Sequence, residues 1–280
     1  MQETTQTAHA LGMLVEALKG ADVFVRADEF DTDALIEFAT DNSQLSRAAT
    51  LFVCKGASFK REYLLQAIEA GAVAYVSEID YEVDVPCIIV SDIRRTLGCL
   101  ADIAYDHPSG KVGVCAFTGT KGKTTSAYYL KGVLDAHARL VGCHTSALFS
   151  SVEFDDGVES GISKLTTPES FELERRLSNA VLSGCEHVIM EASSQALKYE
   201  RTYGVDFAVG AFTNIGEDHI SPIEHPTFED YFASKLKIFK QSRAAVVNLD
   251  MDHVDEVLEA ARVCERVVTY SLSNSDADVY

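Results

Sequence analysis

The segment over residues 118–125, TGTKGKTT, constrains the fold more than any other part of the chain. It follows a short apolar run at residues 112–117 and precedes a helical pattern over residues 126–136. A strand, a glycine-rich turn and a helix in this order are the context of a phosphate-binding loop. Gly119 and Gly122 let the backbone approach an anion and turn its N–H groups toward it. The segment therefore predicts an α/β domain with a phosphate site at the start of a helix.

Two side chains of this loop can act on a nucleotide. Lys123 can reach the outer phosphates, and the hydroxyl of Thr124 is placed to hold Mg²⁺. Phe117 stands where the general Walker A pattern has its first glycine, so the loop is not a plain Walker A. The alternative interpretation is a surface turn whose threonines cap a helix. We favour phosphate binding, and the predicted nucleotide-binding residues are Gly119, Thr120, Lys121, Gly122, Lys123, Thr124 and Thr125.

Composition limits the partners of the chain. Its 280 residues include 24 basic and 43 acidic ones, which gives a formal net charge of −19. This charge argues against nucleic acid and anionic membrane surfaces as main partners. The first residues lack the pattern of a signal peptide, and no apolar stretch approaches the ~20 residues of a membrane span. Seven cysteines occur singly, which is typical of reduced thiols, so we expect a cytoplasmic protein.

The N-terminal part of the chain predicts a small α/β unit with a partly parallel sheet. The expected strands cover residues 49–54, 72–76 and 86–90, and the expected helices cover residues 11–18, 62–69 and 96–105. The segment YDHPSG at residues 105–110 interrupts this alternation with turn-forming residues. We therefore predict two domains, residues 1–108 and residues 109–280.

The C-terminal part predicts a doubly wound, mainly parallel sheet. Apolar strand patterns recur after the glycine loop at residues 187–190, 207–212, 244–247 and 266–270. A helical pattern at residues 171–182 lies between them. Ligands of such sheets bind beyond the carboxyl ends of the strands. The glycine loop, Glu191 and His219 are therefore expected to share one edge of the sheet.

Three residues near these strand ends are candidates for metal chemistry. Glu191 is a natural Mg²⁺ partner, although a glutamate at a strand end is often only solvated. His219 alone is more typical of a hydrogen-bonded loop residue than of a ligand. Lys235 falls on the aromatic stripe of a helix predicted over residues 228–240. It is either a snorkelling lysine or a desolvated amine that is kept inside for chemistry.

Several ordered motifs resemble the Mur ligases, most closely the tripeptide synthetases among them. They are TGTKGKTT at 118–125, TTPE at 166–169, MEASS at 190–194, TN at 213–214, DH at 218–219 and FEDYFASK at 228–235. The match extends from about Asn42 through nearly all of the chain. The resemblance implies an ATP-dependent ligase of peptidoglycan synthesis, with UDP-N-acetylmuramoyl-dipeptide and an amino acid of the lysine or diaminopimelate class as substrates. In this family the substrate carboxylate attacks the γ-phosphate of ATP, and an amine then attacks the acyl phosphate.

The resemblance also implies roles for single residues. Lys123 would steady the β- and γ-phosphates, while Thr124 and Glu191 would hold a first Mg²⁺. His219 and Lys235 would serve a second Mg²⁺, with Lys235 carbamylated by CO₂, which turns an amine into an anionic oxygen ligand.

The same resemblance predicts where the larger substrate binds. The N-terminal domain would bind UDP, with Ser43 at the uracil. The residues expected to hold the muramoyl peptide are Thr166, Thr167, Ser193 and Arg201. The guanidinium of Arg201 offers a bidentate fork for a carboxylate or phosphate.

The chain departs from the family pattern at several positions. Lys121 stands where asparagine is usual, Gln195 where histidine is common, and Leu165 where asparagine is common. The loop at residues 56–59 lacks the usual polar pattern, and the segment at residues 221–224 is longer than typical.

The family's third domain, which binds the incoming amino acid, would lie beyond Tyr280. We therefore expect the 280 residues to bind UDP-substrate or nucleotide weakly and not to turn over.

Two other functions stay open at this point. Folylpolyglutamate synthases are related enzymes with a similar loop and lysine, but they lack a preceding UDP-type domain, so residues 42–108 argue against them. A non-catalytic nucleotide-binding protein on the same scaffold is the second alternative. It is disfavoured by the retained residues Lys123, Thr124, Glu191, His219 and Lys235.

Overall fold

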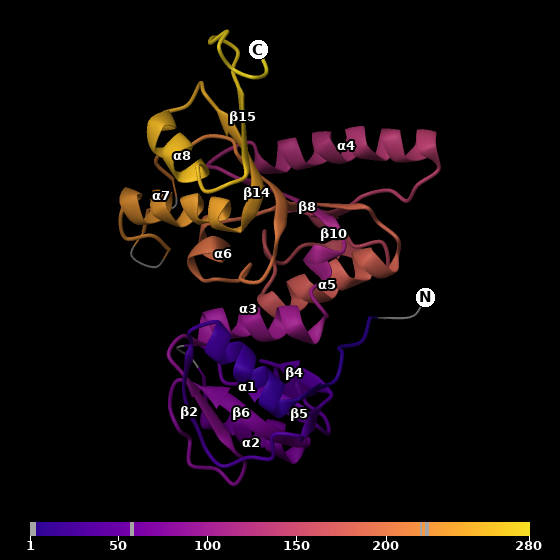
Figure 1. Ribbon diagram of the computed structural model, residues 1–280, viewed down its shortest axis with the longest axis vertical. Coiled ribbons are helices and arrows are strands. Elements are labelled where there is room, and N and C mark those ends of the chain that lie inside the picture. The colour runs from indigo at the N-terminus through magenta and orange to yellow at the C-terminus, as the bar shows by residue number, and fades with distance from the viewer. Residues whose placement is uncertain (1–3, 57–58, 219, 222–223) are drawn as a thin grey trace. The chain divides into compact units, whose positions relative to one another are not determined.

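The structure is a computed structural model that describes residues 4–56, 59–218, 220–221 and 224–280. Residues 5–107 and residues 108–280 form two compact units, each with its own sheet (Figure 1). None of the helices in these described residues combines the length and the apolar character that a membrane crossing requires.

The first unit contains a five-stranded sheet with the order β2-β7-β6-β5-β4. Its strands are β2 (Phe24–Ala27), β4 (Phe38–Thr40), β5 (Thr50–Val53), β6 (Ala72–Ser77) and β7 (Cys87–Val90). The strands from β4 to β7 run parallel, and β2 pairs antiparallel with β7. A short antiparallel pair, β1 (His9–Ala10) with β3 (Leu35–Ile36), completes the strands described in this unit.

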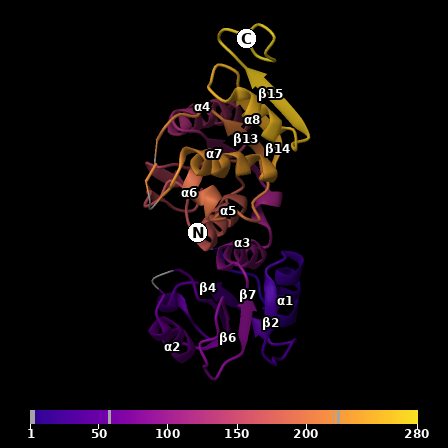
Figure 2. The same ribbon diagram turned by 90° about the vertical axis from the view of Figure 1, so that its left-hand side faces the viewer.

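Helices cover both faces of this first sheet. They are α1 (Leu11–Gly20), α2 (Arg61–Glu69) and α3 (Ile93–Ala104), with the 3₁₀ turn η1 (Ser43–Leu45). Figure 2 shows α1 and α2 on opposite sides of the strands. Phe52 packs with Leu64 of α2, while its neighbour Leu51, fully buried, points to the other face because side chains alternate along a strand. This unit is therefore a three-layer α/β domain.

The second unit is built on an eight-stranded sheet with the order β11-β10-β9-β12-β8-β13-β14-β15. Its strands are β8 (Gly113–Thr118), β9 (Ala147–Phe149), β10 (Glu153–Asp155), β11 (Ser160–Ile162), β12 (His187–Glu191), β13 (Phe207–Phe212), β14 (Ser242–Asn248) and β15 (Arg266–Tyr270). In the order of the sheet, the strands β9, β12, β8, β13, β14 and β15 are parallel to their neighbours in this series. The strands β10 and β11 extend the sheet beyond β9 with antiparallel pairing. Parallel neighbours place their carboxyl ends at one edge, where a ligand site is expected.

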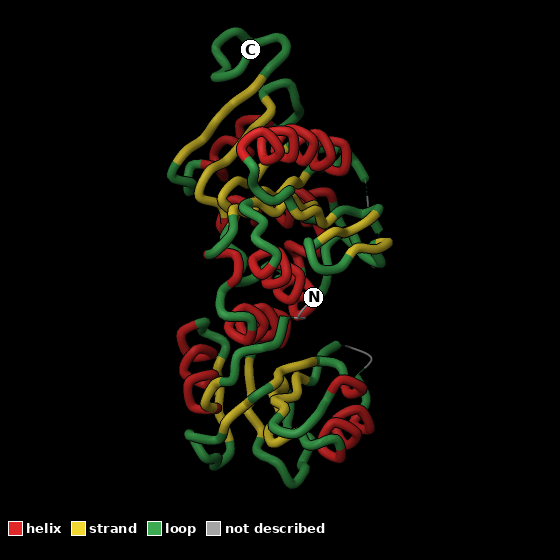
Figure 3. Tube along the Cα trace, turned by 90° about the vertical axis from the view of Figure 1, so that its right-hand side faces the viewer, coloured by secondary structure: helices red, strands yellow, loops and turns green. Residues whose placement is uncertain are grey.

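Helices lie on both faces of this second sheet, which makes it doubly wound (Figure 3). They are α4 (Lys123–Val141), α5 (Ser170–Leu182), α6 (Ser194–Lys198), α7 (Phe228–Leu236) and α8 (Val254–Ala261), with the 3₁₀ turns η2 (Pro108–Gly110) and η3 (Lys237–Gln241). Met190 of β12 belongs to the large core that includes residues of α5, α7 and α8, whereas its neighbour Ile189 packs with Ala127 of α4. Because side chains alternate between the two faces of β12, this strand contributes to a hydrophobic core on each face of the sheet.

The predicted fold class, α/β with a mainly parallel doubly wound sheet, is confirmed. The strands predicted at residues 207–212 and 266–270 have the predicted bounds. The helix predicted over residues 228–240 is wrong beyond Leu236, because the chain tightens into the 3₁₀ turn η3 before β14. The β9–β11 strands were not predicted, since each has only three residues and two of them lie at an exposed sheet edge.

Candidate nucleotide and substrate site

The glycine loop connects β8 to α4 at the carboxyl edge of the sheet. Gly122 is the N-cap of α4 in a left-handed conformation, with φ of 83°. Gly119 has φ of 143°, and a Cβ atom there would lie 2.1 Å from Oγ1 of Thr213. The backbone conformation at both positions therefore favours glycine over a residue with a Cβ atom. The first main-chain N–H groups of α4 have no acceptor within the helix itself, so they suit an anion such as the predicted phosphate.

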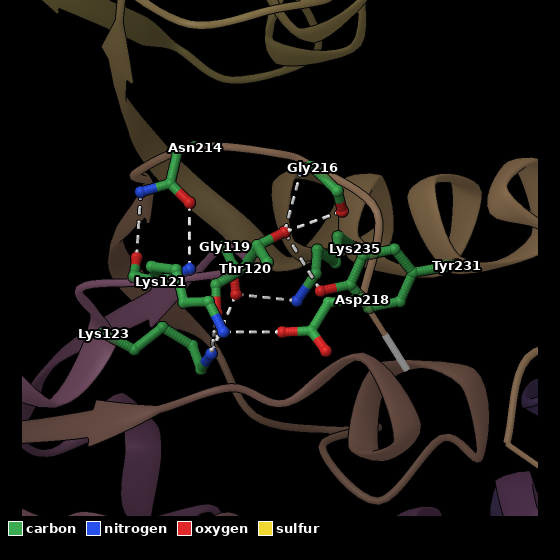
Figure 4. Close-up of polar contacts among 9 residues, drawn as sticks. All are labelled: Gly119, Thr120, Lys121, Lys123, Asn214, Gly216, Asp218, Tyr231 and Lys235. Atoms are coloured by element: carbon green, nitrogen blue, oxygen red, sulfur yellow. Dashed lines mark hydrogen bonds and ion pairs between the residues drawn. The ribbon is translucent and has the colours of Figure 1, made fainter. Parts of the chain in front are cut away.

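Two residues after β13, Thr213 and Asn214, hold the loop in shape, and Figure 4 shows the contacts of Asn214 with Lys121. The main-chain N–H of Thr213 donates to Thr118 O at 3.0 Å, and its hydroxyl donates to Lys121 O at 2.8 Å. Asn214 accepts from Lys121 N at 2.9 Å through Oδ1 and donates to Lys121 O at 3.0 Å through Nδ2. Thr213 and Asn214 form one of the motifs that resemble the family, and in the structure their hydrogen bonds hold the loop in place.

Replacing Gly119 with alanine is expected to lower the free energy of unfolding by about 2 kcal/mol, because the new Cβ would collide with Thr213 in a conformation that favours glycine. Chemical denaturation measures this loss. Gly132 on the exposed face of α4 is the matched control, since nothing lies within 4 Å of a Cβ there. Gly132→Ala should be neutral or stabilising by up to about 1 kcal/mol. Equal effects of the two substitutions would contradict the close packing inferred at Gly119.

The remaining predicted loop residues differ in exposure. Thr120 is buried, and its hydroxyl is 3.1 Å from the hydroxyl of Tyr231. The side chain of Lys121 is 78% exposed and forms an ion pair of 2.8 Å with Asp218. Thr125 is exposed on the first turn of α4. The loop therefore presents main-chain groups and Lys121 outward while Thr120 anchors it to α7.

Two lysine amines converge on one carbonyl oxygen of the loop (Figure 4). Lys123 Nζ donates to Gly119 O at 2.8 Å and to Thr120 O at 3.2 Å. Lys235 Nζ, from α7, donates to the same Gly119 O at 2.9 Å. Lys235 is only 1% exposed, so its amine lies inside, which decides between the two interpretations of its place on the aromatic stripe.

Burial lowers the pKa of both amines. Desolvation is the main cause at Lys123, with partial compensation from the carboxylates of Glu191 and Asp218. Desolvation and the nearby charge of Lys123 lower the pKa of Lys235 to about 7, against the opposing effect of Asp218. At neutral pH a large fraction of Lys235 is therefore a neutral amine, which can act as a nucleophile.

Oxygen atoms that suit Mg²⁺ meet beside the loop. The Thr124 hydroxyl donates to Glu191 Oε1 at 2.9 Å, and Ser151 N donates to the same oxygen at 2.8 Å. Glu191 is 1% exposed, so its carboxylate is held in place without free rotation into water. Within the described part of the chain, no three or more His, Cys, Asp or Glu side chains form a group that could hold a metal. A hydroxyl and one buried carboxylate fit Mg²⁺, which keeps several waters as ligands.

The metal candidate His219 lies outside the described residues. The structure therefore brings together Lys123, Thr124, Glu191 and Lys235 from the predicted set, and it leaves the place of His219 as a prediction.

A pocket of about 210 Å³ adjoins the glycine loop. Its wall includes Lys123, Lys235, Thr166, Ser193, Ser194 and Arg201. Lys123 and Arg201 bring positive charge to this wall, and Glu224 brings a negative charge, so the anionic part of a ligand is expected beside the two cationic side chains. It joins the predicted phosphate lysine to residues predicted to bind the muramoyl peptide.

The polar wall of this pocket is fixed by a network behind it. Thr167 is fully buried, and its hydroxyl donates to Glu191 O at 2.8 Å and accepts from Ser193 N at 3.0 Å. Thr167 thereby ties the strand end of β12 to the turn before α6. Arg201 Nη2 lies 2.9 Å from Glu169 Oε1, so part of its fork already has a carboxylate partner.

The departures Leu165 and Gln195 also line the pocket. In the unit of residues 5–107, the hydroxyl of the predicted uracil-contacting Ser43 donates to Gln66 Oε1 at 3.2 Å.

Comparison with known proteins assigns the chain to a family. Residues 117–280 match the family model of the Mur ligase middle domain. The chain belongs to the Mur ligase family. The UDP-N-acetylmuramoyl-L-alanyl-D-glutamate–L-lysine ligase of Streptococcus thermophilus is 48% identical over 212 residues, which are 75% of this chain and 43% of that protein. The UDP-N-acetylmuramyl-tripeptide synthetase of Lactococcus lactis subsp. cremoris is 44% identical over 237 residues, which are 85% of this chain and 47% of that protein.

The fold of this Mur ligase chain also matches solved structures. The structure of a UDP-N-acetylmuramoyl-L-alanyl-D-glutamate–2,6-diaminopimelate ligase aligns with a TM-score of 0.79 at 21% identity. The alignment covers 97% of this chain and 54% of that one, so both units share its fold. The chain spans about half the length of the curated relatives it matches.

Proposed function

We propose that this chain is part of an ATP-dependent ligase that joins L-lysine to UDP-N-acetylmuramoyl-L-alanyl-D-glutamate. The observation that carries the proposal is a single pocket that contains the phosphate-loop Lys123 together with Thr166, Ser193 and Arg201. A ligase of this kind must bring a substrate carboxylate to the γ-phosphate, so the two sets of residues have to share one space. The names of the sequence relatives support the choice of both substrates.

The chain's own residues account for the first chemical step in this proposal. Lys123 holds the β- and γ-phosphates, and the main-chain N–H groups at the start of α4 face the same anion. Thr124 and Glu191 would hold Mg²⁺, which supplies charge neutralisation at the phosphates when bound. Arg201 and the hydroxyls of Ser193 and Thr166 would orient the peptide carboxylate for in-line attack on phosphorus.

In this proposal Lys235 would hold a second Mg²⁺ after carbamylation, in which its amine nitrogen bonds to the carbon of CO₂ and releases one proton. The reaction with CO₂ needs a neutral amine, and burial lowers the pKa of Lys235 to about 7. The amine is therefore reactive at neutral pH, and the product is a carboxylate-like oxygen ligand. His219 is proposed as its partner at this second metal.

The unit of residues 5–107 is proposed to bind the UDP group, with Ser43 at the uracil, and the unit of residues 108–280 to bind ATP. A cytoplasmic location is proposed as well. It is supported by the seven cysteines, all of which are free thiols.

The experiment that tests the function measures binding of ATP and of UDP-N-acetylmuramoyl-L-alanyl-D-glutamate to the 280-residue chain by calorimetry. We expect both to bind, with ATP binding strengthened by Mg²⁺. The complete enzyme is tested by the release of phosphate from ATP. We expect this release to rise with the dipeptide substrate and to rise further with L-lysine, but not with diaminopimelate. Failure of the chain to bind the dipeptide substrate would instead favour a non-catalytic nucleotide-binding role.

Glu191→Gln is expected to remove most of the Mg²⁺ enhancement of ATP affinity, about 10-fold, because the amide lacks the charge that attracts the metal. Affinity for ATP without Mg²⁺ should change less than about 2-fold. Glu153→Gln is a suitable control, since the carboxylate of Glu153 is exposed and accepts from the hydroxyl of the exposed Tyr128. An unchanged Mg²⁺ enhancement in Glu191→Gln would place the metal elsewhere.

A further inference from the structure

Three side chains from separate segments form a hydrogen-bonded row that ends at the pocket. Ser194 Oγ lies 3.0 Å from His225 Nε2, and His225 Nδ1 lies 2.6 Å from Asp230 Oδ2. His225 is 0% exposed and packs against the ring of Tyr231 with centroids 5.2 Å apart. Ser194 lines the pocket that also contains Ser193. The carboxylate of Asp230 orients the imidazole of His225. The hydrogen bond between the imidazole and Ser194 then fixes the direction of the Ser194 hydroxyl.

The partners of His225 determine which of its nitrogens carries the proton. Asp230 Oδ2 also accepts from Lys198 Nζ at 2.7 Å, and the hydrogen bond from Lys198 is the first cause of a lowered pKa at Asp230. The carboxylate is therefore ionised, and Nδ1 of His225 must be the donor. In the tautomer that carries its hydrogen on Nδ1, Nε2 of His225 is left as an acceptor.

This tautomer fixes the hydroxyl of Ser194. Its Nε2 accepts, so Ser194 donates its only hydrogen to His225. The lone pairs of Ser194 Oγ are then left for the pocket. Lys123 and Arg201 in the same wall are donors that suit the anionic parts of a ligand, while Gln195 and Glu224 of that wall also carry acceptors. Ser194 adds a neutral acceptor whose direction is fixed.

We propose that Ser194 contacts the substrate as a hydrogen-bond acceptor for a peptide N–H group, and that His225 and Asp230 are positioning residues that hold it in this role. The proposal rests on the proposed function, because it assigns the N–H donor to the peptide of UDP-N-acetylmuramoyl-L-alanyl-D-glutamate. Cations of the pocket recognise the carboxylate of that ligand, and Ser194 recognises the amide beside it. A ligand in which the amide is replaced by an ester offers no donor to Ser194.

Two kinds of variant test the row. Ser194→Ala removes the acceptor and is expected to weaken binding of the dipeptide substrate about 10-fold. His225→Asn keeps a donor near the position of Nδ1 but does not reach Ser194, so we expect about 5-fold weaker binding. His225→Gln places an amide oxygen near the position of Nε2 and should restore affinity to within about 2-fold of the unaltered chain.

The control is Ser242→Ala, which removes a buried hydroxyl that donates to Ile238 O at 2.8 Å. It should leave the affinity for the dipeptide substrate unchanged. All variants should bind ATP with Mg²⁺ within about 2-fold of the unaltered chain, because the row does not include the glycine loop. Nitrogen-15 NMR of the imidazole adds a direct readout, since Nε2 of His225 should show the signal of an unprotonated nitrogen.

The outcomes separate the two proposals. If the unaltered chain binds the dipeptide substrate but Ser194→Ala and His225→Asn bind it equally well, the role of the row is overturned and the proposed function stands. A protonated Nε2 in the NMR spectrum would also overturn it. If the unaltered chain does not bind the dipeptide substrate at all, the proposed function fails and the proposal for Ser194 fails with it.

Discussion

Replacing Lys123 with alanine should weaken ATP binding at least about 100-fold. The amine is already positioned within the loop, where it donates to Gly119 O at 2.8 Å, and it needs only a small movement to reach a phosphate oxygen. A charge-assisted hydrogen bond contributes about 1.5–3 kcal/mol, and a lysine between two phosphates makes more than one. A loss of about 3 kcal/mol corresponds to about 100-fold in affinity. Calorimetric titration with ATP and Mg²⁺ measures the loss.

Lys121 provides the control from the same loop. Its side chain is 78% exposed, and its ion pair with Asp218 lies at the surface. Surface charges of this kind are screened by water and salt, so Lys121→Ala should change ATP affinity by less than about 3-fold. If the two alanine variants lost affinity equally, the phosphate would be bound by the general charge of the loop, and a specific role of Lys123 would be ruled out.

The sequence was most informative where a pattern is local. The glycine loop and the strands at residues 207–212 and 266–270 follow from spacing within a few turns of chain. Helical periodicity placed Lys235 among aromatic side chains, but the structure was needed to show that its amine is buried. The carboxyl-edge rule for parallel sheets then predicted that Glu191 approaches the loop, and the structure places it 2.9 Å from the hydroxyl of Thr124.

Contacts between distant segments could not be predicted in this way. The row of Ser194, His225 and Asp230 depends on a turn that returns a histidine 31 residues later to the start of α6. Periodicity carries no information on such pairs, because their spacing is set by loops rather than by a repeat. A cue was present, since Asp230 and Ser194 both lie in motifs quoted for the family resemblance. The clamp of Thr213 and Asn214 on the glycine loop is of the same kind.

Lys235 should make the free energy of unfolding of the chain rise with pH above pH 7. The ordinary lysine pKa is 10.5, and burial lowers the pKa of Lys235 to about 7 in the folded chain. Between these two values the unfolded chain binds the proton more tightly, so the free energy of unfolding rises as the pH is raised from 7 to 10.5. The full effect is on the order of 5 kcal/mol, since each pH unit contributes about 1.4 kcal/mol. Below pH 7 both states hold the proton and the contribution is constant.

Lys235→Met removes this titration while keeping a side chain of similar length. At pH 7 and below, the methionine variant should be more stable by several kcal/mol, because no amine has to be desolvated. Its advantage should shrink steadily toward pH 10.5. Denaturation of both proteins in buffers freed of CO₂, which keeps the amine unmodified, measures the difference. Lys240, exposed on the same segment, is the control, and Lys240→Met should change stability by less than about 0.5 kcal/mol at every pH.

The same substitution separates stability from function. In the proposed mechanism only a lysine can be carbamylated, so Lys235→Met in the complete ligase should lose substrate-stimulated phosphate release even though the folded 280-residue chain is more stable. A buried amine that lowers stability would then be retained for its chemistry, as expected of a functional site. A difference between the methionine variant and the unaltered chain that stays constant from pH 7 to 10.5 would show that Lys235 keeps an ordinary pKa. In that case the amine would be mostly protonated at neutral pH, and the argument for its reactivity would fail.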